Sequence, residues 1–457
     1  MPLSQPPARG VVVESKKTLS RRAASRQSST FGGSSRAASA TNSKVNSRQP
    51  SDDEADDLIS EGGWSTTDSI DGVLGGAEKD SSFSYADELD NRIEAILDRK
   101  RSSTSSREQD FAAYTYLLRS QYSQAQIEGK TSDLLTVFLR SVRDEMSEKE
   151  AINALKAIQV TILTDATEAP YDACLSPLKT VIASSINRNI KEEALYTLGV
   201  AAFFGGAAEN ELEDILSGYL LEIVESDGAH VSAPDDPDVV SAAIDVLALL
   251  STRIQDISET SQDIITALVD QLDSSDARVQ VAAGEAIALL YEKSYSELED
   301  GEQRNEDDGS VSSTNPTVVV TDASGDRTIL KKRYDPYRSP ATLIEKLTEL
   351  SKVSAKSLSK ADRKLLRTGF ADVLQSVEQP HLGPRYSSAI VAGTEDQHYG
   401  SRMKIKFGKN GGTIVVSKWW MLVRLQAIRR VMQGGMVIAF EQNAAVQGAL
   451  KDENWDG

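Results

Sequence analysis

The chain has little of the chemistry on which most catalytic and metal sites depend. It contains one cysteine, Cys174, so no disulfide can form within it and a metal site built from several cysteines is excluded. Its three histidines, His230, His381 and His398, are far apart, and none has the HExxH or HxxxH spacing of a zinc site. The phosphate-binding motif GxxxxGK(S/T) and the nucleophile motif GxSxG are also missing. We therefore expect a protein that is not an enzyme, has no cofactor or metal and takes no small-molecule substrate.

Long apolar runs and aromatic residues are scarce as well. No run approaches the roughly 18–20 apolar residues that a membrane helix needs, and residues 1–10 lack the apolar core of a secretory signal. We expect no membrane partner and a reducing compartment, the cytoplasm, with the nucleus as a second location. Aromatic residues make up 6% of the chain, and Ala, Leu, Ile and Val supply most of the apolar residues. This balance favours packing of helix on helix over a sandwich of sheets.

Charge, in contrast, is abundant and unevenly distributed. Lys and Arg number 50 and Asp and Glu 69, which gives a formal charge of −19. Residues 1–50 contain nine basic residues and one acidic residue, and residues 328–433 contain 20 basic and eight acidic residues. With −3 in residues 434–457, the remaining segment 51–327 carries −36. The average argues against non-specific nucleic-acid binding, but the distribution predicts separate tasks for an acidic body and two basic segments.

Residues 1–84 have the composition of a disordered tail. They are rich in Ser, Ala, Arg and Asp and have few apolar residues to bury. Ser51 heads the acidic run 51–57 and is a candidate phosphorylation site. A solvated tail without regulation is the alternative.

The spacing of capping and apolar residues predicts paired helices from residue 85 to 379. Ser147 and Glu150 stand at the N-cap and the third helical position, as in a capping box, and apolar residues follow at helical spacing. Helix starts of this kind recur about every 40–50 residues, at Ser147, Asn189, Asp236 and Asp276. A second helix fits between successive starts. This period predicts an armadillo- or HEAT-like repeat array, with a non-repetitive helical bundle as the alternative.

Two later segments break the repeat. Residues 295–328 are first acidic and then rich in Ser, Thr, Asn and Pro, so we expect a disordered insertion there. Helices resume at Pro340 and Ser359. Residues 380–457 then form a small C-terminal domain, in which 403–407 alternates at period two and 413–416 completes a β-hairpin. The expected fold is mainly α, an armadillo/HEAT-like helical array followed by this domain with its hairpin and helix.

The last predicted helix runs from about Lys418 to Met432. Its apolar stripe comprises Met421, Leu422, Leu425, Ile428 and Met432. Arg424 and Arg429 flank this stripe, and Arg430 points away from it. Trp419 and Trp420 lie off the stripe in the first turn, and we expect at least one of them to pack against the hairpin.

Three stretches of the chain resemble one known family. They are 126–135, the basic helix 359–374, and a series of short motifs, Lys406-Phe407-Gly408, Ser417-Lys418-Trp419 and Gly434-Gly435-Met436. Over roughly residues 100–450 the chain resembles a fungal member of the interferon-related developmental regulator family. It departs from the family pattern in two places. Lys418 separates Ser417 from Trp419, and Ala439-Phe440 stands where relatives usually have His-Leu.

The resemblance implies a non-enzymatic protein with one of two functions. Some members are ribosome-binding factors that associate with translationally inactive ribosomes, which implies rRNA and ribosomal proteins as partners. Others are transcriptional co-regulators, which implies chromatin co-repressor proteins such as histone-deacetylase assemblies. The basic segment 328–433 favours the ribosome, and the acidic array should face away from RNA.

The basic segment supplies the candidate RNA-binding residues. Arg363 and Arg367 share a helix face, with Lys364 beside them, and Lys404 and Lys406 project from one face of a strand. The predicted RNA-binding set is Arg363, Lys364, Arg367, Lys404, Lys406, Lys418, Trp420, Arg424, Arg429 and Arg430. In this set the cations would contact phosphates and Trp420 would stack on a base. For each cation the alternative is an ordinary solvated helix face, and for Arg363 it is an ion pair with the acidic array.

Overall fold

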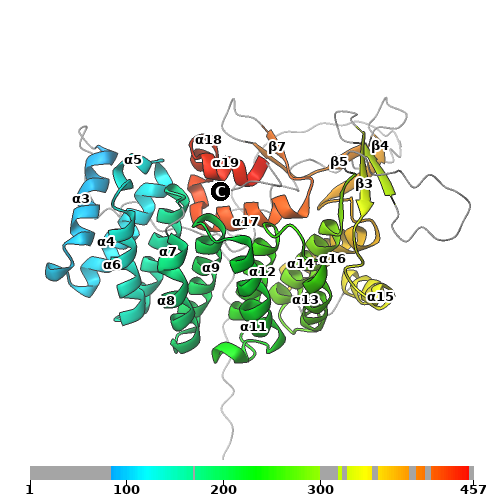
Figure 1. Ribbon diagram of the computed structural model, residues 1–457, viewed down its shortest axis with the longest axis horizontal. Coiled ribbons are helices and arrows are strands. Elements are labelled where there is room, and N and C mark those ends of the chain that lie inside the picture. The colour runs from blue at the N-terminus through cyan, green and yellow to red at the C-terminus, as the bar shows by residue number, and fades with distance from the viewer. Residues whose placement is uncertain are drawn as a thin grey trace, which may run out of the picture. The chain divides into compact units, whose positions relative to one another are not determined.

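Helices stacked in pairs make up most of the described part of the chain, as the repeat period predicts (Figure 1). The computed structural model describes residues 84–167, 170–298, 317–321, 327–352, 359–390, 398–406 and 413–451. The expected disordered tail lies outside these ranges except for Ser84, and so does the candidate phosphorylation site Ser51.

Each helical pair has an outer and an inner helix. The outer helices are α3 (Tyr85–Leu97), α6 (Thr131–Asp144), α8 (Pro170–Ser184), α10 (Glu209–Ile215) continued by α11 (Leu221–Glu225), α13 (Ser258–Gln271) and α15 (Pro340–Ser351). The inner helices are α4 (Thr104–Ser120), α7 (Glu148–Thr164), α9 (Arg188–Phe204), α12 (Pro237–Ser251), α14 (Ala277–Lys293) and α16 (Lys360–Glu378). Each inner helix packs on the next, so together they form one continuous row. The mainly helical fold with its stacked array is thereby confirmed.

Short polar side chains start the inner helices. Asp236 accepts hydrogen bonds from the backbone N–H groups of Asp238 and Val239, and Asp276 accepts one from Arg278. The cap of α9 is Asn187, which bonds the N–H groups of residues 189 and 190, so the predicted start at Asn189 is two residues late. An Asn side chain oxygen bonds the second or third helical N–H, which fixes the helix start at Asn187.

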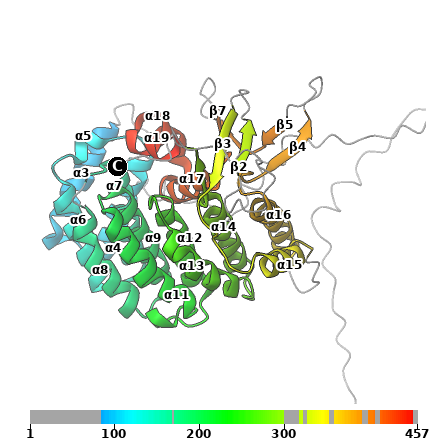
Figure 2. The same cartoon turned by 45° about the vertical axis from the view of Figure 1, so that its right-hand side comes forward.

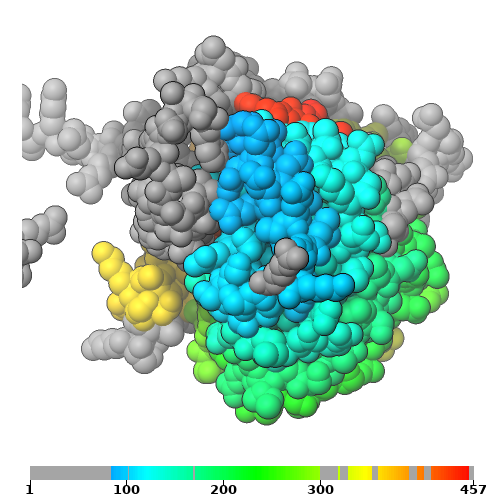
Figure 3. Space-filling model, turned by 90° about the vertical axis from the view of Figure 1, so that its left-hand side faces the viewer, coloured from blue at the N-terminus to red at the C-terminus, as the bar shows by residue number. Residues whose placement is uncertain are grey.

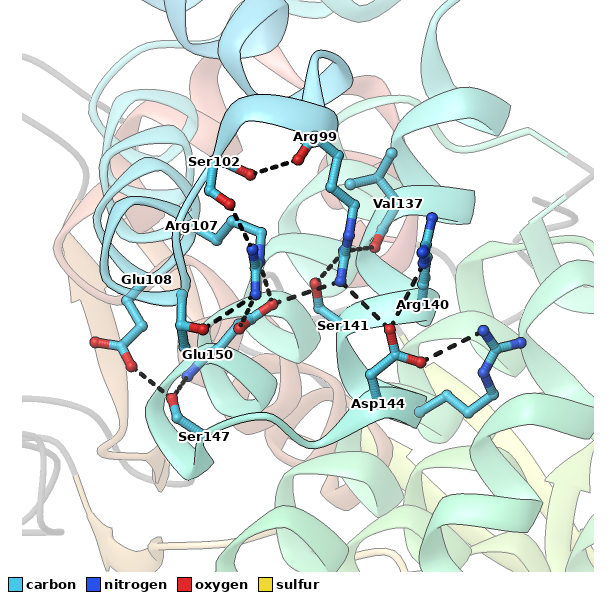
Figure 4. A network of polar contacts seen from close by, with 12 residues as sticks. Arg99, Ser102, Arg107, Glu108, Val137, Arg140, Ser141, Asp144, Ser147 and Glu150 are labelled. Atoms are coloured by element: carbon cyan, nitrogen blue, oxygen red, sulfur yellow. Dashed lines mark hydrogen bonds and ion pairs between the residues drawn. The ribbon is translucent and has the colours of Figure 1, made fainter.

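The cap of α7 is only half of the expected capping box (Figure 4). Ser147 Oγ accepts the N–H of Glu150, as predicted, but the fully buried Glu150 carboxylate does not return to the cap. It accepts two bonds from Arg107, at 2.7 and 2.9 Å from Nε and Nη2, and lies 3.7 Å from Arg99. Because a buried carboxylate needs cationic partners, this ion cluster ties α7 to α4 and to the segment between α3 and α4.

The predicted disordered insertion begins and ends in strands, which corrects part of that expectation. Strands β1 (Tyr295–Glu297), β3 (Arg327–Lys332) and β2 (Thr317–Thr321) form an antiparallel sheet in the order β1-β3-β2. The β-branched run 317–321 pairs along its whole length with β3, which the acidic and polar composition of the segment conceals. Residues 299–316 and 322–326 lie outside the described part of the chain.

Two further strand pairs precede the last helices. Strands β6 (Lys404–Lys406) and β7 (Thr413–Val415) pair antiparallel with Ile405 opposite Ile414, so the predicted hairpin is confirmed. Its turn falls outside the described residues. Strands β4 (Tyr386–Ile390) and β5 (His398–Ser401) form a second pair that the sequence pattern did not predict.

Helix α17 (Trp419–Met432) lies against the inner row of helices, and α18 (Met436–Gln442) and α19 (Ala444–Lys451) follow it (Figures 1 and 2). Figure 3 shows these last helices beside the first ones, and α18 indeed contacts α4. One hydrophobic cluster extends from Leu89 to Leu450. The domain division at residue 379 stays a prediction, while α17–α19 share their core with the array.

Candidate functional site: the C-terminal helix and the basic surfaces beside it

A carboxylate of the array caps the start of α17. Lys418 occupies the N-cap position and makes no side-chain capping bond. Instead, the two carboxylate oxygens of Glu292 in α14 accept hydrogen bonds from the backbone N–H groups of Trp419 and Trp420, at 2.9 and 3.1 Å. The positive end of the helix dipole adds to the attraction. The Trp419 indole then donates to Ser376 Oγ of α16 at 2.7 Å, which joins the same turn to a second inner helix.

Arg424 holds the middle of α17 against the C-terminal end of α12. Its side chain is 1% exposed, and it donates to Thr252 Oγ1 at 2.9 Å and to the Thr252 carbonyl at 2.8 Å. The guanidinium lies over the rings of Phe203 and Trp420, 5.2 and 4.9 Å from their centres. Carbonyls at a helix C-terminus and aromatic faces both favour a cation, so this buried arginine is well accommodated.

Arg430 joins the next turn of α17 to α9. It lies 3.1 Å from Glu192 and 3.9 Å from Glu193, and its guanidinium is stacked 3.3 Å from the ring centre of Tyr196. The Tyr196 hydroxyl in turn donates to Asp245 of α12 at 2.9 Å. The cation is therefore used inside the molecule, in an ion-pair and aromatic cluster.

The chain after α17 is fastened to the first inner helices. Arg119 of α4 donates to the Val431 carbonyl at 2.6 Å and to Gln433 Oε1 at 2.8 Å, and Asn443 donates to the Leu163 carbonyl of α7 at 2.7 Å. A Cβ atom at Gly435 would lie 1.9 Å from the Arg119 carbonyl oxygen, so only glycine fits there. We call residues 418–451 the C-terminal strap, because bonds from this segment reach all six inner helices.

Two of the predicted RNA-binding residues are buried in this structure, and a third is in an internal ion pair. Arg424 and Trp420 are buried, so they cannot contact a phosphate or stack on a base. Arg430 is turned toward α9, where its charge meets Glu192. The apolar stripe misled the prediction because α17 sits among helices on several sides, and polar or aromatic side chains off the stripe also become buried.

The other predicted residues divide into two groups. Lys364 and Arg367 are exposed and Arg363 is half-buried, all on the N-terminal half of α16. Lys404 is exposed on β6 and Lys418 is half-buried before α17. Arg429 is also half-buried, and the Lys406 side chain lies outside the described part of the structure.

Arg363, Lys364 and Arg367 lie near one end of α16, and Lys404 and Lys418 lie near the other. Ser376, which binds Trp419, is 13 residues beyond Arg363, or roughly 20 Å along the helix. The structure thus splits the predicted footprint. We call Arg363, Lys364 and Arg367 the α16 basic cluster.

Carboxylates beside α17 have raised pKa values, which the sequence did not reveal. Asp245 is exposed and Glu285 is half-buried, but the helices packed around them disfavour their charged forms. This desolvation raises the pKa of Asp245 to about 6 and that of Glu285 to about 7. Asp372 adds to the shift at Glu285, while a 3.1 Å hydrogen bond from Gln426 opposes it. The sequence could have indicated that these two carboxylates are neighbours. Asp245 and Glu285 are 40 residues apart, about one repeat, so they lie on the adjacent inner helices α12 and α14.

Among the described residues, His, Cys, Asp and Glu side chains form no group that could hold a metal ion. No helix in the described part of the chain combines the length and apolar character needed to span a bilayer.

Loss of the Arg424 guanidinium should loosen the strap. Arg424→Met keeps much of the packing volume but leaves the Thr252 carbonyl without its donor, so we expect a loss of about 3 kcal/mol. Arg424→Lys should recover little, because one ammonium cannot reproduce the forked contacts. Thermal unfolding and thermolysin cleavage after residue 418 measure both effects, with Gln442→Ala, at an exposed residue of α18, as the control. Wild-type stability and cleavage in Arg424→Met would contradict the assigned role.

Protonation of Glu285 should make stability depend on pH. Below about pH 4 the carboxyl is protonated in the folded and the unfolded chain. Between about pH 4 and pH 7, Glu285 is ionised in the unfolded chain but still protonated in the folded chain. The folded state therefore loses stability as pH rises through this range, and the loss is complete above the folded pKa of about 7. Glu285→Gln should therefore have a higher Tm than the wild type at pH 8 and the same Tm at pH 4.

The control for this comparison is Glu148→Gln. Hydrogen bonding from Asn189 lowers the pKa of Glu148, so removal of its charge should give no gain at pH 8. Equal Tm values for Glu285→Gln and wild type at both pH values would show that Glu285 ionises freely.

The array and the helix that closes it correspond to a known family. The model of the interferon-related developmental regulator family matches residues 58–378, which end with α16. The first two resembling stretches lie inside this match, and the motifs from residue 406 onward lie beyond it. An uncharacterized protein of Schizosaccharomyces pombe is 26% identical over 396 residues, covering 84% of this chain and 78% of the relative. Because the family match covers well over half of the sequence, the chain belongs to the interferon-related developmental regulator family.

Proposed function

We propose that this protein is a non-enzymatic ribosome-binding factor that associates with translationally inactive ribosomes. Its basic C-terminal part would contact rRNA, and the protein would act in the cytoplasm. The observation that carries this proposal is the α16 basic cluster, in which Lys364 and Arg367 extend into solvent beside Arg363. Membership of the family supports the proposal, because some members bind ribosomes.

The α16 basic cluster suits the backbone of an RNA. Its cations lie within one turn of one helix, so they can approach neighbouring phosphates together. Such contacts release counterions and need no particular base sequence. Lys404 and Lys418 offer a second, separate contact near the other end of α16. Because Trp419 joins α17 to Ser376, the two groups are held at a fixed separation and little ordering is needed on binding.

The acidic array should keep RNA at this end of the molecule. Residues 85–298 carry −21 of the −36 in residues 51–327, and this charge repels phosphates over about a Debye length, roughly 10 Å at 0.1 M salt. Basic ribosomal proteins are the complementary partners for the rest of the array. Arg424, Arg430 and Trp420 are left out of the proposed RNA contact, since the strap uses them internally.

Charge reversal of the α16 basic cluster tests the proposal. Wild-type protein should co-sediment with whole ribosomes in a sucrose gradient and dissociate as salt rises. The triple variant Arg363→Glu, Lys364→Glu, Arg367→Glu should bind at least ~10-fold more weakly, and its salt dependence should fall by about 0.7–0.9 per lost phosphate contact.

The matched control reverses three basic residues at the other end of the array. Lys100→Glu, Lys130→Glu, Lys149→Glu changes the net charge equally and should leave sedimentation unchanged. If both triple variants bind like the wild type, the proposed contact is wrong. Wild-type protein that stays in the light fractions and co-purifies with chromatin would instead favour the co-regulator function.

A further inference from the structure

Strand β5 and the residues that follow it expose an aromatic ring among basic side chains. The Tyr399 side chain is 53% exposed, and Arg402 and Lys404 are exposed as well. All three lie within residues 399–404, where the chain passes from β5 into β6. We call Tyr399, Arg402 and Lys404 the β5–β6 surface.

The backbone at Gly400 explains why the ring faces solvent. Successive side chains alternate between the two faces of a strand, so Tyr399 would be expected on the same face as Ser401 and Met403. Those two residues are 6% and 8% exposed, whereas the ring is not buried with them. Gly400 has a φ of 66°, and this left-handed conformation interrupts the alternation. A Cβ atom at Gly400 would meet no atom within 4 Å beyond its chain neighbours, so the surface next to Tyr399 in the chain is open.

The basic side chains of this surface keep their charges available. Residues 397–418 contain five Lys and Arg residues and no Asp or Glu. Within the described ranges, neither Arg402 nor Lys404 has a carboxylate at ion-pair distance. Burial raises the pKa of Asp372, and the charges of Arg385 and Arg402 oppose this shift. Asp372 forms its ion pair with Arg385, at 3.2 Å, so Arg402 is left without a partner of its own.

The strand that carries these cations is fixed to the core. Ser401 Oγ donates to the Val416 carbonyl at 2.6 Å. Met403 and Ile405, on either side of Lys404, are buried in the main hydrophobic cluster. With these two side chains facing the core, the basic ones between and before them face solvent. A preformed surface loses little conformational entropy on binding.

An exposed ring beside unpaired cations suits a nucleic acid whose bases are free. Proteins bind single strands with aromatic side chains on which bases stack and with cations along the backbone. A base inside a duplex is covered on both faces by its neighbours, so it cannot stack on a protein ring. The α16 basic cluster differs in this respect, because Phe370, the one aromatic residue of α16, is fully buried.

We propose that the β5–β6 surface binds an unpaired stretch of RNA, with one base stacked on Tyr399 and the adjoining phosphates on Arg402 and Lys404. This inference rests on the proposed function and names the kind of RNA that the C-terminal contact takes. The α16 basic cluster contacts phosphates whether or not the bases are paired, whereas the β5–β6 surface needs a free base.

Two labelled RNAs test this surface. One is a fluorescein-labelled twelve-nucleotide RNA of CA repeats, which does not pair with itself, and the other is the duplex of the same strand with its complement. Each is titrated into the full-length protein and followed by fluorescence anisotropy. Tyr399→Ala should weaken binding of the single strand at least ~5-fold and leave the duplex unchanged. Tyr399→Phe keeps the ring, so it should bind the single strand within about twofold of the wild type.

Two further variants separate charge from stacking. Arg402→Glu combined with Lys404→Glu should weaken the single strand and lower its salt dependence by about 0.7 per lost phosphate contact. Tyr85→Ala, at another exposed tyrosine, on α3, is the matched control and should bind both RNAs like the wild type.

The same proteins distinguish this inference from the proposed function. Single-strand binding that depends on Tyr399, in a protein that does not sediment with ribosomes, would remove the proposed function and keep the unpaired-RNA contact. Normal sedimentation of the wild type, with Tyr399→Ala binding the single strand as tightly as the wild type, would remove this inference alone.

Two other results would also overturn the inference. The first is an equal loss in Tyr399→Ala and Tyr399→Phe, or an equal loss for single strand and duplex, because neither fits a stacked base. The second is wild-type protein that binds neither RNA. If Tyr399→Ala then still weakens ribosome sedimentation, the surface contacts a ribosomal protein instead.

Discussion

The capping of α17 by Glu292 is the contact on which the arrangement of the C-terminal half depends. A helix that begins with Lys418-Trp419-Trp420 has no capping side chain of its own, so its first N–H groups need an acceptor from elsewhere. Glu292 supplies both oxygens from α14, 127 residues earlier in the chain. Once this end is fixed, Arg424 reaches α12 and Arg430 reaches α9, and the strap crosses the inner row. Repeat arrays are usually held together by contacts between neighbouring repeats. Here one helix also joins repeats that are not neighbours.

This constraint changes where the basic charge of the C-terminal part can act. The sequence places 20 Lys and Arg residues in 328–433, but Arg424 and Arg430 are used to hold the strap. The α16 basic cluster and Lys404 remain on the surface. The acidic residues of the array also have two roles. Glu292 and Glu192 bind the strap, whereas Asp245 and Glu285 lie beside it with pKa values raised by desolvation. Net charge by segment therefore indicates which part of the molecule can meet RNA, but it does not identify the residues that do so.

Local patterns predicted the elements well, and contacts between distant segments limited the rest. Ser147, Asp236 and Asp276 marked true helix starts, and the 40-residue period gave the array, because both depend on residues close in sequence. The strands at 317–321 and 327–332 were missed because each is stable only when paired with the other. The burial of Arg424 could not be seen from a helical wheel, since its acceptor is the carbonyl of Thr252.

The central claim is that the strap is an integral part of the array's core. Hydrogen–deuterium exchange along α17 in the full-length protein tests it most directly. The N–H groups of Trp419 and Trp420 would exchange within seconds in an uncapped, exposed helix. If Glu292 and the inner row hold them, they should be protected as strongly as the amides of α12. Rapid exchange throughout 419–432, with α12 still protected, would contradict the account.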